Sequence, residues 1–381
     1  MYDPCSLSSL GASIKRILHT FNTKKVLLIH GYQSFKDYES VVTDAIAPDI
    51  LLFRASGFSL YPELEDILNV ANTARLEGID TVIAIGGGTI IDIAKSVSVL
   101  WQQEAATMLS LLDTDIDFLE PQRLKLLTIP TTCGTGAEVT PFAVIYDGAA
   151  KHSFYGNSLI PQQFIHCPPL AVSLSNEQIA VGAFDTLSQA IESIWSKGSV
   201  TASREYAGEA VRLVMDNVDE AVRTRSPKAM TCLMKASFLS GRAIAITKTT
   251  GPHALSYPLT RKFSIPHGLA VMITLPYFFL FHDKILNLED ESYPVLRQHL
   301  EYILGLLNVK SGRHAFEVLC GLAARINVDI SLSAYISAGD LAVLQQCNFN
   351  EDRLRNHPVT INRSDIQQIF TSSFDRLSAI A

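Results

Sequence analysis

The sequence predicts an N-terminal α/β domain with a parallel sheet over residues 1–169, followed by an all-α helical domain over residues 170–381. The length of 381 residues exceeds that of one typical domain. In the first half, apolar runs of strand length alternate with helical patterns, which is typical of a parallel sheet. From about Leu174 only long helical patterns remain, so we place the boundary near Pro168-Pro169.

The strands of the first domain are expected in four places. Residues 25–31, 81–85 and 126–130 are apolar on both faces, as in parallel strands covered by helices. Residues 142–147 form a further strand that leads into a turn. A helix is expected over residues 63–77, because leucine, isoleucine and alanine recur there at helical spacing. The first domain therefore follows the order strand, helix, strand.

The composition describes a well-packed globular protein, with 48% hydrophobic and 18% charged residues. A net charge of −7 argues against binding to nucleic acid or to an anionic membrane surface. The apolar run over residues 269–281 is too short to span a bilayer. Six scattered cysteines without a Cys-x-x-Cys pair argue against a disulfide framework. With no secretory signal pattern at the N-terminus, we expect a cytoplasmic protein.

A glycine-rich turn follows the strand at residues 81–85. It reads Gly86-Gly87-Gly88-Thr89 and leads directly into a helical run. Glycines let a ligand approach the backbone closely, and the N–H groups and dipole of a helix N-terminus favour a phosphate. We expect Thr89 to be the N-cap and Asp92 to complete a capping box. A tight turn with an ordinary cap fits equally well, because the Gly-x-Gly-x-x-Gly spacing is missing.

A second polar loop follows the strand at residues 126–130. It contains Thr131, Thr132 and Thr135 together with two glycines. Loops at the carboxyl ends of parallel strands line the ligand crevice of open α/β sheets. A polar loop without a ligand is the alternative, but two such loops after two buried strands favour a binding site.

Four residues of the second half are candidates for a metal site. His253 and His267 each follow a proline, which would hold their imidazoles at the ends of elements. Asp185 and Gln189 lie one turn apart on a predicted helix. Oxygen and imidazole ligands suit Fe2+ or Zn2+, and such a cation can polarise a carbonyl. Taken alone, the histidine pair favours ordinary packing over metal binding, so the metal site depends on the carboxylate upstream. A nucleotide on the first domain facing a metal on the second suggests hydride transfer in the cleft between them.

Four motifs in this order resemble those of the iron-containing (group III metal-dependent) alcohol dehydrogenases. They span residues 86–92, 130–138, 185–192 and 253–268. The resemblance implies an NAD(P)-dependent oxidoreductase acting on CH–OH groups, with the nucleotide on the N-terminal domain and a metal on the helical domain. By resemblance, the cofactor-binding residues are Gly87, Gly88, Thr89, Asp92, Thr131, Thr132 and Thr135, with Lys151 near the ribose, and the metal ligands are Asp185, Gln189, His253 and His267.

The sequence departs from the family pattern at two positions. Gln189 stands where a histidine ligand is usual, and its carbonyl is a weaker, neutral ligand. Tyr257 replaces a histidine that usually lies near the nicotinamide, so it either takes over a proton relay or simply packs. With these two departures, the chain resembles the phosphonoacetaldehyde reductases, which form 2-hydroxyethylphosphonate. The similar motifs lie at residues 142–146, 185–196 and 253–257. Lys248, Arg261 and His152 are then candidate partners for the phosphonate, or surface charges.

The cofactor preference has one clue. Relatives that prefer NADH commonly carry an aspartate at the end of the first strand, and the matching residue here is Gly31. Because no carboxylate would repel a 2′-phosphate, we expect NADPH. The alternative is that Gly31 only makes a turn and that NADH also serves. The substrate is expected to be a small aldehyde, and the assembly a homodimer. The alternatives are a short-chain aldehyde or diol dehydrogenase, a lyase of the dehydroquinate synthase type, and a non-enzymatic binding protein.

Overall fold

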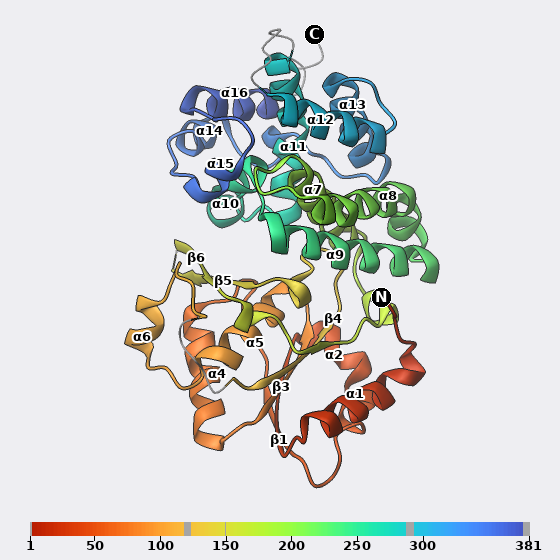
Figure 1. Cartoon of the computed structure of the whole chain (residues 1–381), viewed down its shortest axis with the longest axis vertical. Coiled ribbons are helices and arrows are strands. Elements are labelled where there is room, and N and C mark those ends of the chain that lie inside the picture. The colour runs from red at the N-terminus through yellow and green to blue at the C-terminus, as the bar shows by residue number, and fades with distance from the viewer. Residues whose placement is uncertain (1, 118–122, 149, 287–292, 376–381) are drawn as a thin grey trace. The chain divides into compact units, whose positions relative to one another are not determined.

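The computed structural model describes residues 2–117, 123–148, 150–286 and 293–375 (Figure 1). It divides into two compact units, Met1–Leu174 and Ser175–Ala381. The division falls a few residues after the boundary that the sequence suggested.

The N-terminal unit is built on a five-stranded parallel sheet in the order β2-β1-β3-β4-β7. Its strands are β1 (Lys25–His30), β2 (Leu51–Ala55), β3 (Thr81–Gly86), β4 (Lys125–Pro130) and β7 (Gln163–Phe164). The three predicted parallel strands are confirmed. Gly86 pairs with Pro130 in the register of β3 and β4, so the glycine-rich turn and the threonine loop start at the same edge of the sheet.

Helices cover both faces of this sheet because its central strands are apolar on both faces. Leu27 and Ile29 pack with α4 (Leu64–Glu77) and α5 (Gly88–Leu100), whereas Val26 and Leu28 pack with α1 (Leu7–Phe21) and α3 (Glu39–Thr43). Figure 1 shows α4 and α5 on the side of the sheet away from α1. The alternation follows from the two-residue period of a strand.

A two-stranded antiparallel hairpin completes the unit. It consists of β5 (Phe142–Asp147) and β6 (Ala150–Tyr155), and β5 confirms the fourth predicted strand. The other elements of this unit are short. They are α2 (Tyr32–Phe35), α6 (Ala105–Ser110), and the 3-10 helices η1 (Lys36–Tyr38), η2 (Ala137–Val139), η3 (Asn157–Leu159) and η4 (Pro168–Ala171).

The second unit contains only helices within its described residues. The long ones are α7 (Asn176–Trp195), α8 (Thr201–Thr224), α9 (Pro227–Thr247), α10 (Gly251–Phe263), α11 (His267–Leu286), α12 (Pro294–Leu306), α13 (Gly312–Arg325) and α16 (Arg363–Phe374), and the short ones are η5 (Leu332–Ala334), α14 (Ala338–Leu344) and α15 (Glu351–Asn356). A parallel α/β unit followed by a helical unit confirms the predicted fold class.

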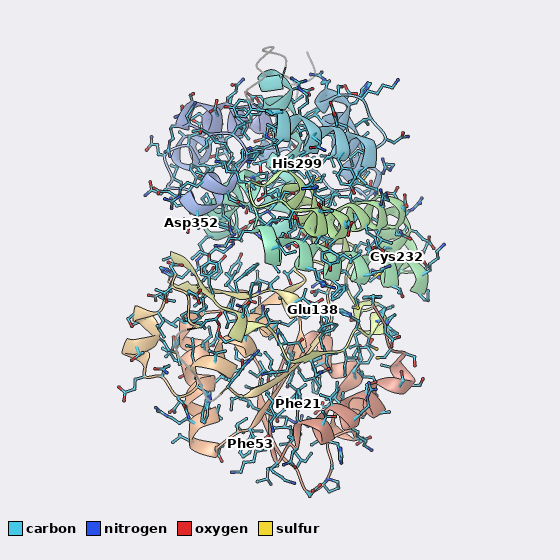
Figure 2. The ribbon with its side chains drawn as sticks, in the orientation of Figure 1. Phe21, Phe53, Glu138, Cys232, His299 and Asp352 are labelled. Carbon is cyan, nitrogen blue, oxygen red and sulfur yellow. The ribbon has the colours of Figure 1, made fainter. Side chains whose placement is uncertain are left out.

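Helix α7 forms the centre of the helical unit. It starts with a capping box between Ser175 and Gln178, and every residue from Ala183 to Trp195 is buried. It packs against α8, α9 and α11. Among the described residues, α9 alone has the length and apolar character of a membrane-crossing helix, and 67% of its most apolar window is buried inside the structure. Figure 2 shows the side chains of both units.

The two candidate histidines lie at helix N-termini, as the neighbouring prolines predicted. His253 is the third residue of α10, and His267 is the first residue of α11. The next residue, Gly268, allows α11 to approach α7 closely, because a Cβ there would lie 2.0 Å from the carbonyl oxygen of Val181 and 3.0 Å from Asp185. This glycine therefore brings His267 beside the aspartate.

Candidate functional site

Three of the predicted metal residues meet in the helical unit. The ligand atoms of Asp185, His253 and His267 all lie within 4.8 Å of one another, and the first two residues are buried. The Oδ1 atom of Asp185 lies 3.3 Å from the Nε2 atom of His253. Two ligands each about 2.1 Å from a tetrahedral cation are about 3.4 Å apart. The spacing and the donor atoms therefore fit a zinc or ferrous ion.

Glu192 fixes the orientation of His253. Its Oε1 atom accepts a short hydrogen bond from Nδ1 of His253, and its Oε2 atom accepts from the amide and the hydroxyl of Thr250, at 2.6 and 2.8 Å. With Nδ1 as a donor, Nε2 faces Asp185. Burial alone would lower the pKa of His253, but the carboxylates of Glu192 and Asp185 raise it to about 10. Glu192 was expected nearly on the same face of the helix as Asp185, but no function was predicted for it.

His267 is held through its other ring nitrogen. Its Nδ1 atom lies 3.4 Å from the hydroxyl of Ser256, which donates to the carbonyl of His253 at 2.8 Å. The ring of His267 lies edge-on to that of His253, with 5.3 Å between the ring centroids, and stacks on that of Tyr257, with 6.1 Å between the centroids and 29° between the planes. Tyr257 is thus adjacent to the cluster.

Gln189 belongs to the same hydrogen-bonded cluster. Its Oε1 atom accepts a hydrogen bond of 3.0 Å from Ser240, and its side chain also hydrogen-bonds to Asp185. Burial alone would raise the pKa of Asp185, but hydrogen bonds from His253 and Gln189 and the charges of the two histidines hold it below its usual value. All four predicted residues are therefore neighbours, with the amide oxygen of Gln189 directed at Ser240.

The glycine-rich turn in the sheet unit differs in detail from the prediction. Gly87, and not Thr89, is the N-cap of α5. Thr89 lies inside the first turn, and its hydroxyl donates to the carbonyl of Leu60 at 2.7 Å. The predicted capping box is also wrong, because the carboxylate of Asp92 accepts from the amide of Val144 at 3.0 Å. Glycine can take the N-cap position without a side-chain hydrogen bond.

Burial raises the pKa of Asp92 to about 6, against the opposing charges of Lys95 and Lys151. Lys151, predicted near the ribose, therefore lies within electrostatic reach of this carboxylate. Lys95 is fully buried, and its ammonium donates to Thr140 and to the carbonyl of Phe142, both at 2.8 Å. Burial lowers its pKa to about 8. This lysine ties α5 to β5, and no sequence motif marked it.

The threonine loop packs directly on the glycine-rich turn. A Cβ on Gly88 would lie 2.8 Å from the methyl group of Thr135, and a Cβ on Gly87 would lie 3.1 Å from that of Thr132. Thr131 is buried, and its hydroxyl has no hydrogen-bond partner in the part of the chain that the structure describes. A bare backbone at a helix N-terminus beside an unpaired hydroxyl fits the phosphates of a dinucleotide.

Gly31 follows β1 directly, and its amide donates to the carbonyl of Ile85 at 3.1 Å. Gly31, on which the expected preference for NADPH rests, therefore lies at the end of β1. It is next to β3, the strand that leads into the glycine-rich turn.

Two family models match this chain, one in each half. Residues 6–168 match the family model described as iron-containing alcohol dehydrogenase, and residues 179–374 match that of the Fe-containing alcohol dehydrogenase family, C-terminal. This chain belongs to the iron-containing alcohol dehydrogenase family. It is therefore an oxidoreductase acting on alcohol or aldehyde groups, and membership implies NAD(P) and a divalent metal. The predicted family and enzyme class are confirmed.

Individual relatives differ in their substrates. The chain is 30% identical over 313 residues to phosphonoacetaldehyde reductase of Streptomyces viridochromogenes, covering 76% of this chain and 77% of the relative. It is 33% identical to long-chain-alcohol dehydrogenase 1 of Geobacillus thermodenitrificans, covering 84% of both chains. A solved structure of sulfoacetaldehyde reductase from Bifidobacterium kashiwanohense with NAD+ is similar, with a TM-score of 0.81, 25% identity, and coverage of 98% of this chain and 99% of that one.

Proposed function

We propose that this chain reduces phosphonoacetaldehyde to 2-hydroxyethylphosphonate, with NADPH as the hydride donor and a divalent metal as the electrophile. The observation that carries the metal-dependent chemistry is the cluster of Asp185, His253 and His267. Support for the substrate comes from the phosphonoacetaldehyde reductase relative and from the motifs at residues 185–196 and 253–257. The sulfoacetaldehyde reductase has a substrate of similar shape, a two-carbon aldehyde with an anionic group.

The metal site would use Asp185, His253 and His267, with Gln189 as the fourth residue, and would hold Fe2+ or Zn2+. Such a cation supplies a Lewis acid for the aldehyde oxygen. In the neutral imidazole that a metal requires, Glu192 would keep the proton of His253 on Nδ1 and leave the Nε2 lone pair to the metal. The overall reaction consumes one aldehyde, one NADPH and one proton. The proton reaches the product oxygen from Tyr257, water or a ribose hydroxyl.

The nucleotide would bind to the N-terminal domain, residues 1–169, and the metal to the C-terminal domain, residues 170–381. The packing of the threonine loop on the glycine-rich turn supports a site for the phosphates and ribose there. The residues that we assign to it are Gly87, Gly88, Thr89, Asp92, Thr131, Thr132, Thr135 and Lys151. Gly31 has no carboxylate that would repel a 2′-phosphate, which favours NADPH over NADH. The six cysteines are free thiols, in keeping with a cytoplasmic enzyme, and we expect a homodimer.

The phosphonate needs cationic partners. Lys248 follows α9 and Arg261 lies in α10, the helix that carries His253, so both remain candidates. His152 is a weaker candidate, because its Nδ1 atom lies 2.6 Å from the carboxylate of Asp113 in the other unit. A carboxylate that already pairs with this ring would compete with a phosphonate for it.

The test is an NADPH-oxidation assay with Fe2+ or Zn2+, using phosphonoacetaldehyde, acetaldehyde and longer neutral aldehydes. We expect the highest kcat/KM for phosphonoacetaldehyde. His267→Ala should lower turnover about 100-fold or more, since it removes a ligand of the electrophile, while NADPH binding is retained. Equal or better turnover of neutral aldehydes would indicate a general short-chain aldehyde or diol dehydrogenase instead. Turnover without net NADPH consumption would indicate a lyase of the dehydroquinate synthase type.

A further inference from the structure

Ser240 on α9 faces the amide of Gln189 inside the helical unit. Its side chain is fully buried, and its hydroxyl lies 3.0 Å from Oε1 of Gln189 and 3.1 Å from the carbonyl oxygen of Ser237. A hydroxyl has one proton and two lone pairs. It can donate to Gln189, or it can donate to Ser237 and accept a hydrogen bond from Gln189.

The amide of Gln189 has a matching pair of arrangements. In the structure its oxygen accepts from Ser240, and its side chain also bonds to Asp185. A carboxylate only accepts, so the donor in that second bond is the amide NH2 group. The oxygen and nitrogen of a carboxamide have nearly the same size, so the amide can turn over without repacking its neighbours.

A cation would reverse the preference between these arrangements. Without a cation, the amide NH2 beside the Asp185 carboxylate is favourable, and a carbonyl oxygen there would be repelled. A cation bound by Asp185, His253 and His267 attracts the carbonyl oxygen and repels the NH2 group. After turning over, the NH2 group needs an acceptor, and the hydroxyl of Ser240 provides one while it donates to Ser237.

We propose that Gln189 turns over when a divalent cation binds, so that its oxygen becomes the fourth protein ligand, and that Ser240 is the hydrogen-bond partner that permits both orientations. This rests on the proposed metal site. The site then has one charged ligand, Asp185, and three neutral ones. Ser240 is a positioning residue, because it contacts Gln189 and acts on the metal only through it.

The experiment is a titration of the metal-free protein with Co2+, in which the visible absorption of the bound ion is measured after each addition. Gln189→Leu should shift the absorption bands and weaken Co2+ binding at least tenfold, because a ligand is lost. Ser240→Ala should leave the bands in place and weaken binding about fivefold. The bound state then has a buried NH2 without an acceptor, which costs more than the unpaired carbonyl oxygen left in the metal-free state.

Ser188→Ala is the matched control. Ser188 is a buried serine on α7 between Asp185 and Gln189, and its hydroxyl has no partner among the described residues, so Co2+ binding should not change. Unchanged bands in Gln189→Leu would overturn the inference and leave the proposed function standing. Unchanged affinity in Ser240→Ala would overturn the role of Ser240. If the wild type binds no Co2+, both proposals fail.

A crystal structure of the wild type with Zn2+ gives a test that does not depend on a folded variant. We expect an oxygen of Gln189 about 2.0–2.2 Å from the zinc ion and its nitrogen next to Ser240. An amide that still accepts from Ser240, with zinc bound by the other three residues, would overturn the inference.

Discussion

Replacing Glu192 by glutamine should disable the metal site without changing its shape. Glu192 is fully buried, and its Oε2 atom accepts both hydrogen bonds from Thr250. A glutamine oxygen can take over those two bonds. The amide NH2 then occupies the place of Oε1 and faces Nδ1 of His253, which must become an acceptor. The proton of the neutral imidazole moves to Nε2, where it blocks the lone pair needed for a metal.

The size of the effect follows from the bond that is lost. A hydrogen bond to a charged group contributes about 1.5–3 kcal/mol. Changing the partner of a metal-binding histidine typically lowers metal affinity about 10- to 100-fold, which corresponds to about 1.4–2.7 kcal/mol. The two ranges agree. We therefore expect Glu192→Gln to weaken Zn2+ or Co2+ binding by about 10- to 100-fold.

The assay is competition for Zn2+ against a chelator, with the metal-free protein checked for folding by urea unfolding. Glu138→Gln is the matched control (Figure 2). Glu138 is also a buried glutamate that pairs with a histidine, His166, at 3.0 Å, but it belongs to the sheet unit. It should alter stability and leave Zn2+ affinity unchanged. If Glu192→Gln folds and binds Zn2+ as tightly as the wild type, the proposed orienting role is wrong.

Three further changes probe other parts of the structure. Gly268→Ala should cost about 3 kcal/mol in urea unfolding and weaken Co2+ binding, because its Cβ would overlap a carbonyl oxygen of α7, whereas Gly305→Ala, which meets open space, should cost nothing. Burial lowers the pKa of His282 to about 3, so the unfolded chain alone gains this proton as the pH falls below about 6.5. Protonation of this residue in the unfolded chain should therefore lower the free energy of unfolding at pH 5 by about 2 kcal/mol relative to its value above pH 7. His282→Phe should make the free energy of unfolding depend less steeply on pH between pH 5 and pH 7. Gly88→Ala should raise the Kd for NADPH measured by titration, since its Cβ would lie 2.8 Å from a threonine methyl group; an unchanged Kd would contradict the assignment of the glycine turn.

Local patterns in the sequence were sufficient for four of the strands but not for β2, β6 and β7, which were not predicted. The strands at residues 25–31, 81–85, 126–130 and 142–147 were predicted correctly, because buried strands are continuous apolar runs. The placement of His253 and His267 at the ends of elements was also predicted, because proline and glycine act on the backbone next to them. The cap of α5 was misplaced, since Thr89 has the side chain of a good cap but its hydroxyl bonds to a distant carbonyl.

The sequence by itself determined the two-part architecture and the residue types of the proposed metal site, because apolar period, breakers and motif spacing are encoded locally. Only the tertiary structure decided which atoms those residues present to one another. Glu192 contacts Thr250 and His253 from another helix, and Ser240 reaches Gln189 from α9. Such contacts join segments about 50 or 60 positions apart, and no local pattern records them. The orientation of each ligand is therefore a property of helix packing, with Gly268 setting the distance between α7 and α11.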